Sequence, residues 1–474
     1  RLAGGAFAQA IYAAQPAVGG NPLPPSLTRL DAVNNNFATP EKLRVFTNSL
    51  TASYGITDQL TIKNILAYRT FTDRLTNALD GAGGLIDPFG SGNPFLITSV
   101  PIYSREKQWT DELQLNYKSA AFDAVGGIFY YTQRYNYQAP LFALKSVPNF
   151  TPPVGLVSKS RAKTHNSSIA GFVQATAHLT SRFDLTGGIR RTEDKRITTA
   201  IDPTSAAVQA GTFRRKFSHT DWTVNAAYRA SDGLMFYGRV ATGYLSGGVV
   251  TSGIPFKPEE ITQYEVGIKS EMLDRRLRVN VAGFYSDYKD LQALDFSQGF
   301  VRFTNAGKSR IRGLEVEVSA RPFDRLTLNA NAGYTDFKYL SYVIGGVDLT
   351  DTYRPLYFPK FTSSANADLT LATFGSGSKL SLNVGAEYRS QIRYAQPVNS
   401  PALNAATISP RRLMLDGRVM LDDVQLSGAD CRISLWARNL TNQRKLAYVA
   451  DLGTVVEGTF QEPRSFGIDL SANF

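Results

Sequence analysis

Apolar and polar side chains alternate along most of this chain, and segment 277–285 shows the pattern most clearly. Leu277, Val279 and Val281 fall on one side of an extended strand, whereas Arg278 and Asn280 fall on the other, because successive strand side chains point to opposite faces. The second side is too polar, and such segments are too long and too numerous, for a single buried core to explain them. The pattern predicts a closed, all-β transmembrane barrel with its apolar face against lipid and its polar face toward a lumen.

The composition favours strands over helices as the membrane-crossing elements. The 474 residues are 43% hydrophobic with a mean hydropathy of −0.19, and no run of about 18 apolar residues occurs, so no transmembrane helix is predicted. The net charge of +11 is dispersed, without a Lys/Arg run or a basic helix, and we expect no nucleic-acid partner. Basic side chains in a lumen or at a lipopolysaccharide surface explain the charge equally well.

A strand, a short turn, a second strand and a long loop recur from the C-terminus back to residue 43. The short turns carry Asp or Gly, as at 231–233, which suit turn geometry. This alternation of short turns and long loops is typical of antiparallel up-and-down barrels in outer membranes, with short periplasmic turns and long extracellular loops. Seventeen strands are expected, at 43–54, 60–73, 105–118, 123–136, 165–179, 183–198, 214–229, 234–246, 260–273, 277–291, 306–321, 325–339, 361–373, 379–393, 411–422, 431–441 and 464–474.

No arrangement of residues predicts catalysis or a metal bound by the protein itself. Cys431 is the only cysteine and the three histidines are scattered, so neither a disulfide nor a ligand cluster is expected. The segment 375–379 lacks the spacing of a phosphate-binding loop and is predicted to be a turn, as are Asp422 and Asp423. An outer-membrane lipase or protease would need a Ser/His/Asp arrangement that we do not find, so we expect no enzyme activity and no cofactor.

Several phrases of the sequence also occur in a known family. They are S-I-A-G-F-V-Q-A-T-A-H-L-T at 168–180 with F-D-L-T-G-G-I-R at 183–190, K-P-E-E-I-T-Q-Y-E-V-G-I-K at 257–269, D-R-R-L-R at 274–278, G-F-Y-S-D-Y at 283–288, G-L-E-V-E at 313–317, A-R-N-L-T-N at 437–442 and the final Phe474. These residues resemble the TonB-dependent outer-membrane receptors of Gram-negative bacteria, in the style of sphingomonads. The resemblance covers residues 43–474.

The resemblance implies a barrel of about 22 strands that is closed by an N-terminal plug. Nothing in this sequence looks like the plug, the TonB-binding box or a signal peptide. A last strand that ends in the periplasm would make the first predicted strand the sixth of about 22. We therefore expect a fragment, in which residues 1–42 are an extracellular loop segment and residues 43–474 are a partial barrel.

Aromatic and basic residues stand at the predicted loop-side ends of several strands. In the family that the sequence resembles, such residues meet ferric-siderophore ligands, because Arg matches an anionic chelate and aromatic rings cover its apolar faces. An interfacial aromatic girdle with solvated loop charges is the alternative interpretation. The candidate ligand-binding residues are Tyr103, Arg105, Trp109, Arg134, Tyr135, Tyr137, Tyr353, Arg354, Tyr357, Arg389, Arg393 and Tyr394.

The sequence thus predicts the barrel portion of an active-transport receptor in the bacterial outer membrane. The favoured cargo is a small-molecule iron chelate, a ferric siderophore, which carries its own iron. Cobalamin, a glycan or an aromatic compound are alternative cargoes, and a passive porin-like channel is the alternative class. Expected partners are outer-membrane lipid and lipopolysaccharide, and TonB through a segment outside this sequence. We expect a monomer.

Overall fold

Neighbouring strands pair antiparallel in their order along the chain, as expected for strands that short turns connect. The computed structural model describes residues 3–4, 6–21, 26, 28–31, 41–78, 84–86, 95–146, 156–158, 161–202, 210–249, 255–295, 302–396, 401–426, 428–451 and 455–473. Among these residues, seventeen strands of nine or more residues form one sheet: β2 (Glu41–Gly55), β3 (Leu60–Ala78), β4 (Phe95–Lys118), β5 (Phe122–Gln138), β8 (Arg161–Thr180), β9 (Phe183–Asp202), β10 (Gly211–Ser231), β11 (Leu234–Leu245), β14 (Glu259–Met272), β15 (Leu277–Lys289), β18 (Gly307–Phe323), β19 (Leu326–Ile344), β21 (Phe361–Thr373), β22 (Lys379–Arg389), β25 (Arg412–Leu426), β26 (Ala429–Arg438) and β29 (Ser465–Asn473).

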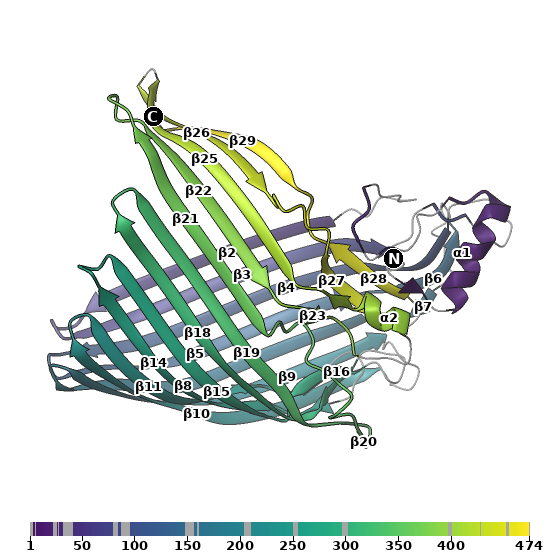
Figure 1. Ribbon diagram of the computed structural model, residues 1–474. Helices are drawn as coiled ribbons and strands as arrows, with labels where there is room; N and C mark the ends of the chain where they lie inside the picture. The colour runs from purple at the N-terminus through teal and green to yellow at the C-terminus, as the bar shows by residue number, and fades with distance from the viewer. Residues whose placement is uncertain are drawn as a thin grey trace.

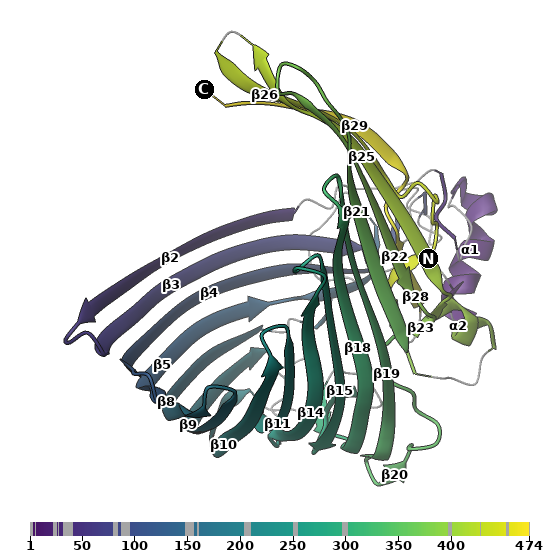
Figure 2. The ribbon, with the colours of Figure 1, turned by 60° about the vertical axis from the view of Figure 1, so that its left-hand side comes forward.

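Each predicted strand corresponds to one of these, so the predicted antiparallel up-and-down sheet is confirmed. Its long strands curve into a barrel wall (Figure 2). Among the described residues, β2 is hydrogen-bonded only to β3 and β29 only to β26, and Figure 2 shows these two strands apart. All side chains of β2 are exposed, which fits a strand with one neighbour. The wall therefore has two edges, at β2 and β29.

The apolar face of the sheet points outward. In β14, Tyr264 and Val266 are 48% and 67% exposed, whereas Gln263 and Glu265 between them are half-buried on the concave side. A recess of about 600 Å³ on the concave side is lined by polar residues that include Asn280 and Asn329. The arrangement of lipid-facing and lumen-facing residues therefore follows the predicted alternation.

Two segments that the sequence predicts to be turns differ in the structure, because one is a turn and the other belongs to a strand. Residues 374–378 form the turn between β21 and β22, as predicted, and the Phe374 amide donates to the carbonyl of Ser378. The prediction that Asp422 and Asp423 lie in a turn is wrong. Both lie in β25, where the register with β26 shifts between Leu421 and Val424. The bulge extends the strand beyond its predicted end, and Asp423 pairs with Lys379 at 3.2 Å.

Short elements and two helices gather at the loop end of the sheet (Figure 1). No helix was predicted there, and no described helix is long and apolar enough to cross a membrane. The predicted strand 379–393 ends at Arg389, because residues 392–393 form a separate hairpin strand. The additional elements are α1 (Ala6–Val18), α2 (Pro401–Ala406), β1 (Ala3–Gly4), β6 (Leu141–Ser146), β7 (Leu156–Ser158), β12 (Gly248–Val249), β13 (Pro255–Phe256), β16 (Gln292–Asp295), β17 (Arg302–Asn305), β20 (Val347–Asp348), β23 (Ile392–Arg393), β24 (Ile408–Ser409), β27 (Leu446–Asp451) and β28 (Val455–Phe460).

The N-terminal residues contact loops next to both edges of the curved sheet. The Gln15 side chain in α1 donates to the carbonyl of Ile86 at 3.0 Å and accepts from its amide at 2.7 Å, which ties α1 to the loop between β3 and β4. Arg29 donates to the carbonyl of Gln461 at 2.8 Å, and Asp31 pairs with Arg444 at 2.5 Å. This segment therefore links the loops next to the two edges of the wall.

Candidate ligand-binding site

The sequence-predicted residues of β4 and β5 divide between the two faces of the wall. In β4, the exposed residues alternate with buried Ser104 and Glu106, so odd-numbered positions point outward, as do Leu113 and Leu115, 45% and 47% exposed. Four predicted residues lie on this outer face and do not line the lumen: Tyr103, Arg105, Trp109 and Arg134. The alternative interpretation of an interfacial girdle fits their position.

Tyr135 and Tyr137 of β5 point to the concave side. Their rings stack with centroids 6.1 Å apart, and Tyr135 also contacts Phe71 of β3 with centroids 6.3 Å apart. Tyr135 lies directly opposite the buried Glu106 of β4. These two tyrosines therefore form an aromatic strip on the inner wall near the loop end.

Five of the other six predicted residues come from two separate segments and meet in one place, whereas the ring of Tyr353 packs against Tyr342 with centroids 5.1 Å apart, in another cluster. The Tyr357 amide donates to the Arg393 carbonyl at 2.8 Å, and the Arg354 amide donates to the side-chain oxygen of Gln396 at 2.9 Å. Gln396 in turn donates to the carbonyl of Arg354 at 3.0 Å. We call this group of five the arginine–tyrosine site, and its predicted members are Arg354, Tyr357, Arg389, Arg393 and Tyr394.

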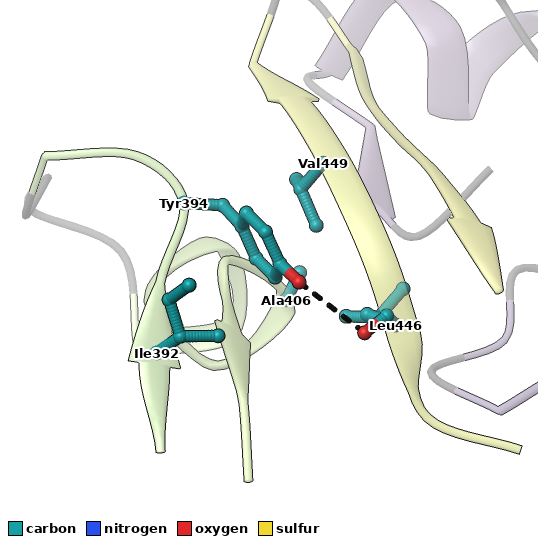
Figure 3. Close-up of a cluster of buried hydrophobic side chains, with 5 residues drawn as sticks. All are labelled: Ile392, Tyr394, Ala406, Leu446 and Val449. Atoms are coloured by element: carbon teal, nitrogen blue, oxygen red, sulfur yellow. Dashed lines mark hydrogen bonds between the residues drawn. The ribbon is translucent and has the colours of Figure 1, made fainter. Parts of the chain in front are cut away.

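Tyr394 forms the floor of the arginine–tyrosine site. It is 4% exposed, and its hydroxyl donates to the carbonyls of Ala447 at 2.8 Å and Leu446 at 3.3 Å in β27. Figure 3 shows its ring packed among apolar side chains from two loops, namely Ile392, Ala406, Leu446 and Val449. The floor is therefore held rigidly by packing and by hydrogen bonds to the backbone of β27.

Tyr357 stands above this floor and is 47% exposed. Its ring meets Tyr394 edge-on with centroids 5.4 Å apart and stacks on Tyr448 at 6.0 Å. Burial, and then its neighbour Tyr448, raise the pKa of Tyr357 to about 12, so the phenol keeps its proton at neutral pH. Its backbone φ of 59° is uncommon for a bulky residue, and such conformations are held where surrounding contacts enforce them.

Four arginines of the site lack acidic partners. Within the described residues, no ion pair joins Arg354, Arg389, Arg393 or Arg412 to a carboxylate. Arg389 and Arg412 lie directly opposite each other on β22 and β25, and Arg389 donates to the Ser409 hydroxyl at 2.8 Å. Among the described residues, the Nη1 atom of Arg393 and the Nε atom of Arg412 are buried without a hydrogen-bond partner.

Electrostatics around Arg393 indicate uncompensated positive charge. Burial, and next the charge of Arg354, lower the pKa of the Arg393 guanidinium, although an arginine remains protonated at neutral pH. Buried N–H groups and like charges in proximity are costly without a partner. The arrangement is therefore suited to an anion, with tyrosine rings beside it. No group of three or more His, Cys, Asp or Glu residues that could hold a metal occurs in the described part of the chain.

Sequence reasoning missed two members of the arginine–tyrosine site. Arg412 had a signal, because it begins the strand that follows Arg389 and shares its inward face. Tyr448 had none, because the segment 442–463 shows no alternation and only the fold places it against Tyr357.

Comparison with known proteins identifies the family to which this architecture belongs. Residues 3–440 match the family model described as TonB dependent receptor-like, beta-barrel. The chain belongs to the TonB-dependent receptor family. Receptors of this family are outer-membrane β-barrels, and their activity is transport.

Some related proteins are similar to part of this chain in sequence, and others are similar to it in fold. The pesticin receptor of Yersinia enterocolitica is 32% identical over 172 residues, which are 34% of this chain and 25% of that protein. The crystal structure of the ferric yersiniabactin uptake receptor FyuA from Yersinia pestis is similar with a TM-score of 0.74 and 20% identity, over 93% of this chain and 63% of that one. The crystal structure of the siderophore receptor PiuA from Acinetobacter baumannii is similar with a TM-score of 0.70 and 15% identity, over 92% of this chain and 65% of that one. This chain thus spans less than two thirds of each relative.

Proposed function

We propose that this chain forms the wall and the extracellular vestibule of a receptor that imports an anionic ferric siderophore. The observation that carries the proposal is the arginine–tyrosine site, where four arginines that form no ion pair within the described residues lie near tyrosine rings. The site lies among the loops at the end of the sheet opposite the short turns (Figure 1), where a ligand from the medium would arrive first.

The chemistry of the site matches that of a ferric chelate. A siderophore binds iron through anionic oxygen groups, and a guanidinium donates paired hydrogen bonds to such groups. A chelate with aromatic rings can also stack on Tyr357 and Tyr448. The Tyr357 hydroxyl, which donates to the Val449 carbonyl at 3.3 Å, keeps its proton at neutral pH and would not compete with the chelate for iron. The iron would therefore travel inside its ligand and need no protein cofactor.

The names of related proteins support the same class of cargo. One similar structure is a ferric yersiniabactin uptake receptor and another is a siderophore receptor. We propose that transport draws energy through TonB, as the family name implies, and that the receptor works as a monomer in an outer membrane that contains lipopolysaccharide.

Uptake by whole cells tests this function. The complete gene product is expressed in a Gram-negative host without its own siderophore receptors, and accumulation of radio-iron siderophores, cobalamin and maltodextrins is compared. We expect an anionic ferric siderophore to accumulate in a TonB-containing host and not in a TonB-deficient one. Accumulation of cobalamin or maltodextrin alone would contradict the proposed cargo, and uptake that is independent of TonB would favour a passive channel.

A further inference from the structure

One side of the arginine–tyrosine site is built by the loop between β26 and β29. This loop contains two paired strands, β27 and β28, which we call the arm. The carbonyls of Leu446 and Ala447 in β27 accept hydrogen bonds from the Tyr394 hydroxyl, and Tyr448 stacks on Tyr357 with ring centroids 6.0 Å apart. The position of the arm therefore determines where the floor of the site and one of its aromatic rings lie.

The N-terminal residues pair with the arm on the side away from the site. β28 is the middle strand of a small sheet whose order is β1, β28, β27. Ala3 and Gly4 of β1 lie opposite Val456 and Val455 of β28, and Figure 1 shows the N-terminus beside this strand. The arm thus has the arginine–tyrosine site against β27 and the N-terminal residues against β28.

Arg29 connects the two stems of the arm, which are residues 442–445 and 461–463. Its guanidinium donates to the side-chain oxygen of Asn442 at 3.2 Å and to the carbonyl of Gln443 at 3.4 Å in the first stem. The same group donates to the carbonyl of Gln461 at 2.8 Å in the second stem. A guanidinium suits this role because its five N–H groups lie in one rigid plane. One side chain therefore holds the two stems together.

Asp31 adds a second contact to the first stem. Its carboxylate pairs with Arg444 at 2.5 Å, and Arg444 also donates to the carbonyl of Arg29 at 3.3 Å. The Asp31 side chain is 80% exposed, and an exposed ion pair contributes little by itself. The hydrogen bonds of Arg29 are therefore the stronger contact. We call Arg29 and Asp31 together the N-terminal clamp.

The N-terminal clamp belongs to a segment that is also attached elsewhere. Gln15 of α1 is 1% exposed and exchanges two hydrogen bonds with the backbone of Ile86. The Asn21 amide donates to the carbonyl of Gly84 at 2.9 Å. The segment is thus fixed to the loop between β3 and β4 before it reaches the arm. The clamp therefore connects the arm to a second, separate loop.

We propose that Arg29 and Asp31 are positioning residues of the arginine–tyrosine site. They hold the arm where Tyr448 stacks on Tyr357 and where β27 accepts the hydroxyl of Tyr394. The inference rests on the proposed function for the identity of the ligand and extends it to residues outside the site. Groups that support a binding residue keep it in the productive geometry and lower the ordering cost of binding. The clamp thus acts on an anionic chelate through the arm and does not touch it.

Fluorine NMR of the complete gene product in detergent tests the clamp without any cargo. A fluorine atom on the Tyr448 ring reports its neighbour, because stacked rings shift each other's resonances. The reference for a lost contact is Tyr357→Ala, which removes the stacked ring. We expect Arg29→Ala to move the resonance toward this reference, because the two stems lose their bridge. Arg444→Asp should do the same, because it places a second negative charge beside Asp31. An unchanged resonance in both variants would overturn the proposal.

Charge reversal separates positioning from a general effect on the loops. The double variant Asp31→Arg/Arg444→Asp restores a pair of opposite charges and should return the resonance to its wild-type position. Arg276→Asp is the matched control, because Arg276 pairs with Asp324 at 3.2 Å in a turn at the other end of the sheet. These two side chains are 47% and 76% exposed, against 38% and 80% in the pair of the clamp. A double variant that does not restore the resonance, or an equal change in the control, would contradict the clamp.

Binding of an anionic ferric siderophore to cells that express the complete receptor tests the consequence for the site. We expect Arg29→Ala to weaken binding by about threefold to tenfold, as for residues that act through others. Asp31→Arg/Arg444→Asp should bind like the wild type. If Arg29→Ala shifts the resonance but binds the chelate like the wild type, the clamp does not position the site and the inference is wrong. If the wild type binds no siderophore, the proposed cargo is wrong, and the resonance still decides whether the clamp holds the arm.

Discussion

The ring of Tyr357 meets the ring of Tyr394 edge-on with centroids 5.4 Å apart, although the two residues belong to different loops. Tyr394 is fixed from below by its hydroxyl, which donates to Ala447 in a third segment, β27. The exposed Tyr357 therefore rests on a floor that three segments of the chain build together. This relationship makes the loop end of the wall an organised surface that can hold a ligand.

Removing the hydroxyl of Tyr394 should loosen that floor. In Tyr394→Phe the carbonyl of Ala447 loses the hydroxyl as a donor, whereas the carbonyl of Leu446 still accepts from Ser409 and Arg389. A lost buried hydrogen bond costs about 1 kcal/mol. We expect faster amide hydrogen exchange in β23 and β27, with exchange in β14 and β15 unchanged. Tyr54→Phe is the control, because Tyr54 is 70% exposed on β2. If Tyr394→Phe exchanges like the control, the hydroxyl does not hold the floor.

Charge placed on the two faces of β15 should have opposite consequences. Val279→Arg puts a cation against lipid and should destabilise the folded barrel, by less than the roughly 2–4 kcal/mol expected at mid-membrane, because Val279 is the third residue of β15. Asn280→Arg adds the same charge to the polar recess and should be tolerated. Urea unfolding of the complete gene product in lipid vesicles measures both free energies. Equal destabilisation by the two substitutions would contradict the assignment of the faces.

The pairing of Asp31 with Arg444 should depend on pH. The hydrogen bond from Arg444, and then its charge, lower the pKa of Asp31 below 3.8. A carboxylate whose pKa is depressed in the folded state stabilises it above the unfolded pKa, and this contribution is lost as the pH falls through the lowered value. At neutral pH, Asp31→Asn should therefore speed amide exchange at Arg29, whose amide donates to Arg444 at 3.2 Å.

The same comparison at low pH completes this test. Below the lowered pKa, wild-type Asp31 is protonated, so wild type and Asp31→Asn should exchange alike, whereas Asp232→Asn in the turn before β11 should match the wild type at every pH. A difference between wild type and Asp31→Asn that persists unchanged in acid would show that the ion pair is not its cause.

The strands could be predicted because period-two alternation is a local property. Tyr264 and Val266 alternate with polar residues within one strand, so the strand has an apolar and a polar face. The apolar face must lie against lipid and the polar face toward the lumen, so the direction of each face follows from the sequence. The same alternation could have assigned the β5 candidates to the two faces of the sheet, because Ile128 and Tyr130 are lipid-facing and exposed. Counting by twos from them puts Arg134 outside and leaves Tyr135 inside.

The loop end could be predicted only in part. Arg and Tyr cluster beside strand ends at residues 353–357 and 389–394, and the structure brings these two segments together. The contribution of Tyr448 and Val449 depends on long-range packing that leaves no periodic trace in the sequence. Segment 6–18 is rich in alanine, a strong helix former, but alternation does not detect a helix, and α1 was missed.

Binding of anionic and neutral ferric chelates to cells that express the complete receptor tests the central claim most directly. The double variant Arg354→Ala/Arg393→Ala removes two cations of the arginine–tyrosine site, at about 1.5–3 kcal/mol for each charged hydrogen bond lost. Arg275→Ala is the control, because the Arg275 side chain is 87% exposed at a turn. We predict that the wild type and the control bind an anionic ferric siderophore, and that the double variant binds it at least tenfold more weakly with little change for a neutral chelate. Undiminished binding of the anionic chelate by the double variant, or no siderophore binding by the wild type, would contradict the account.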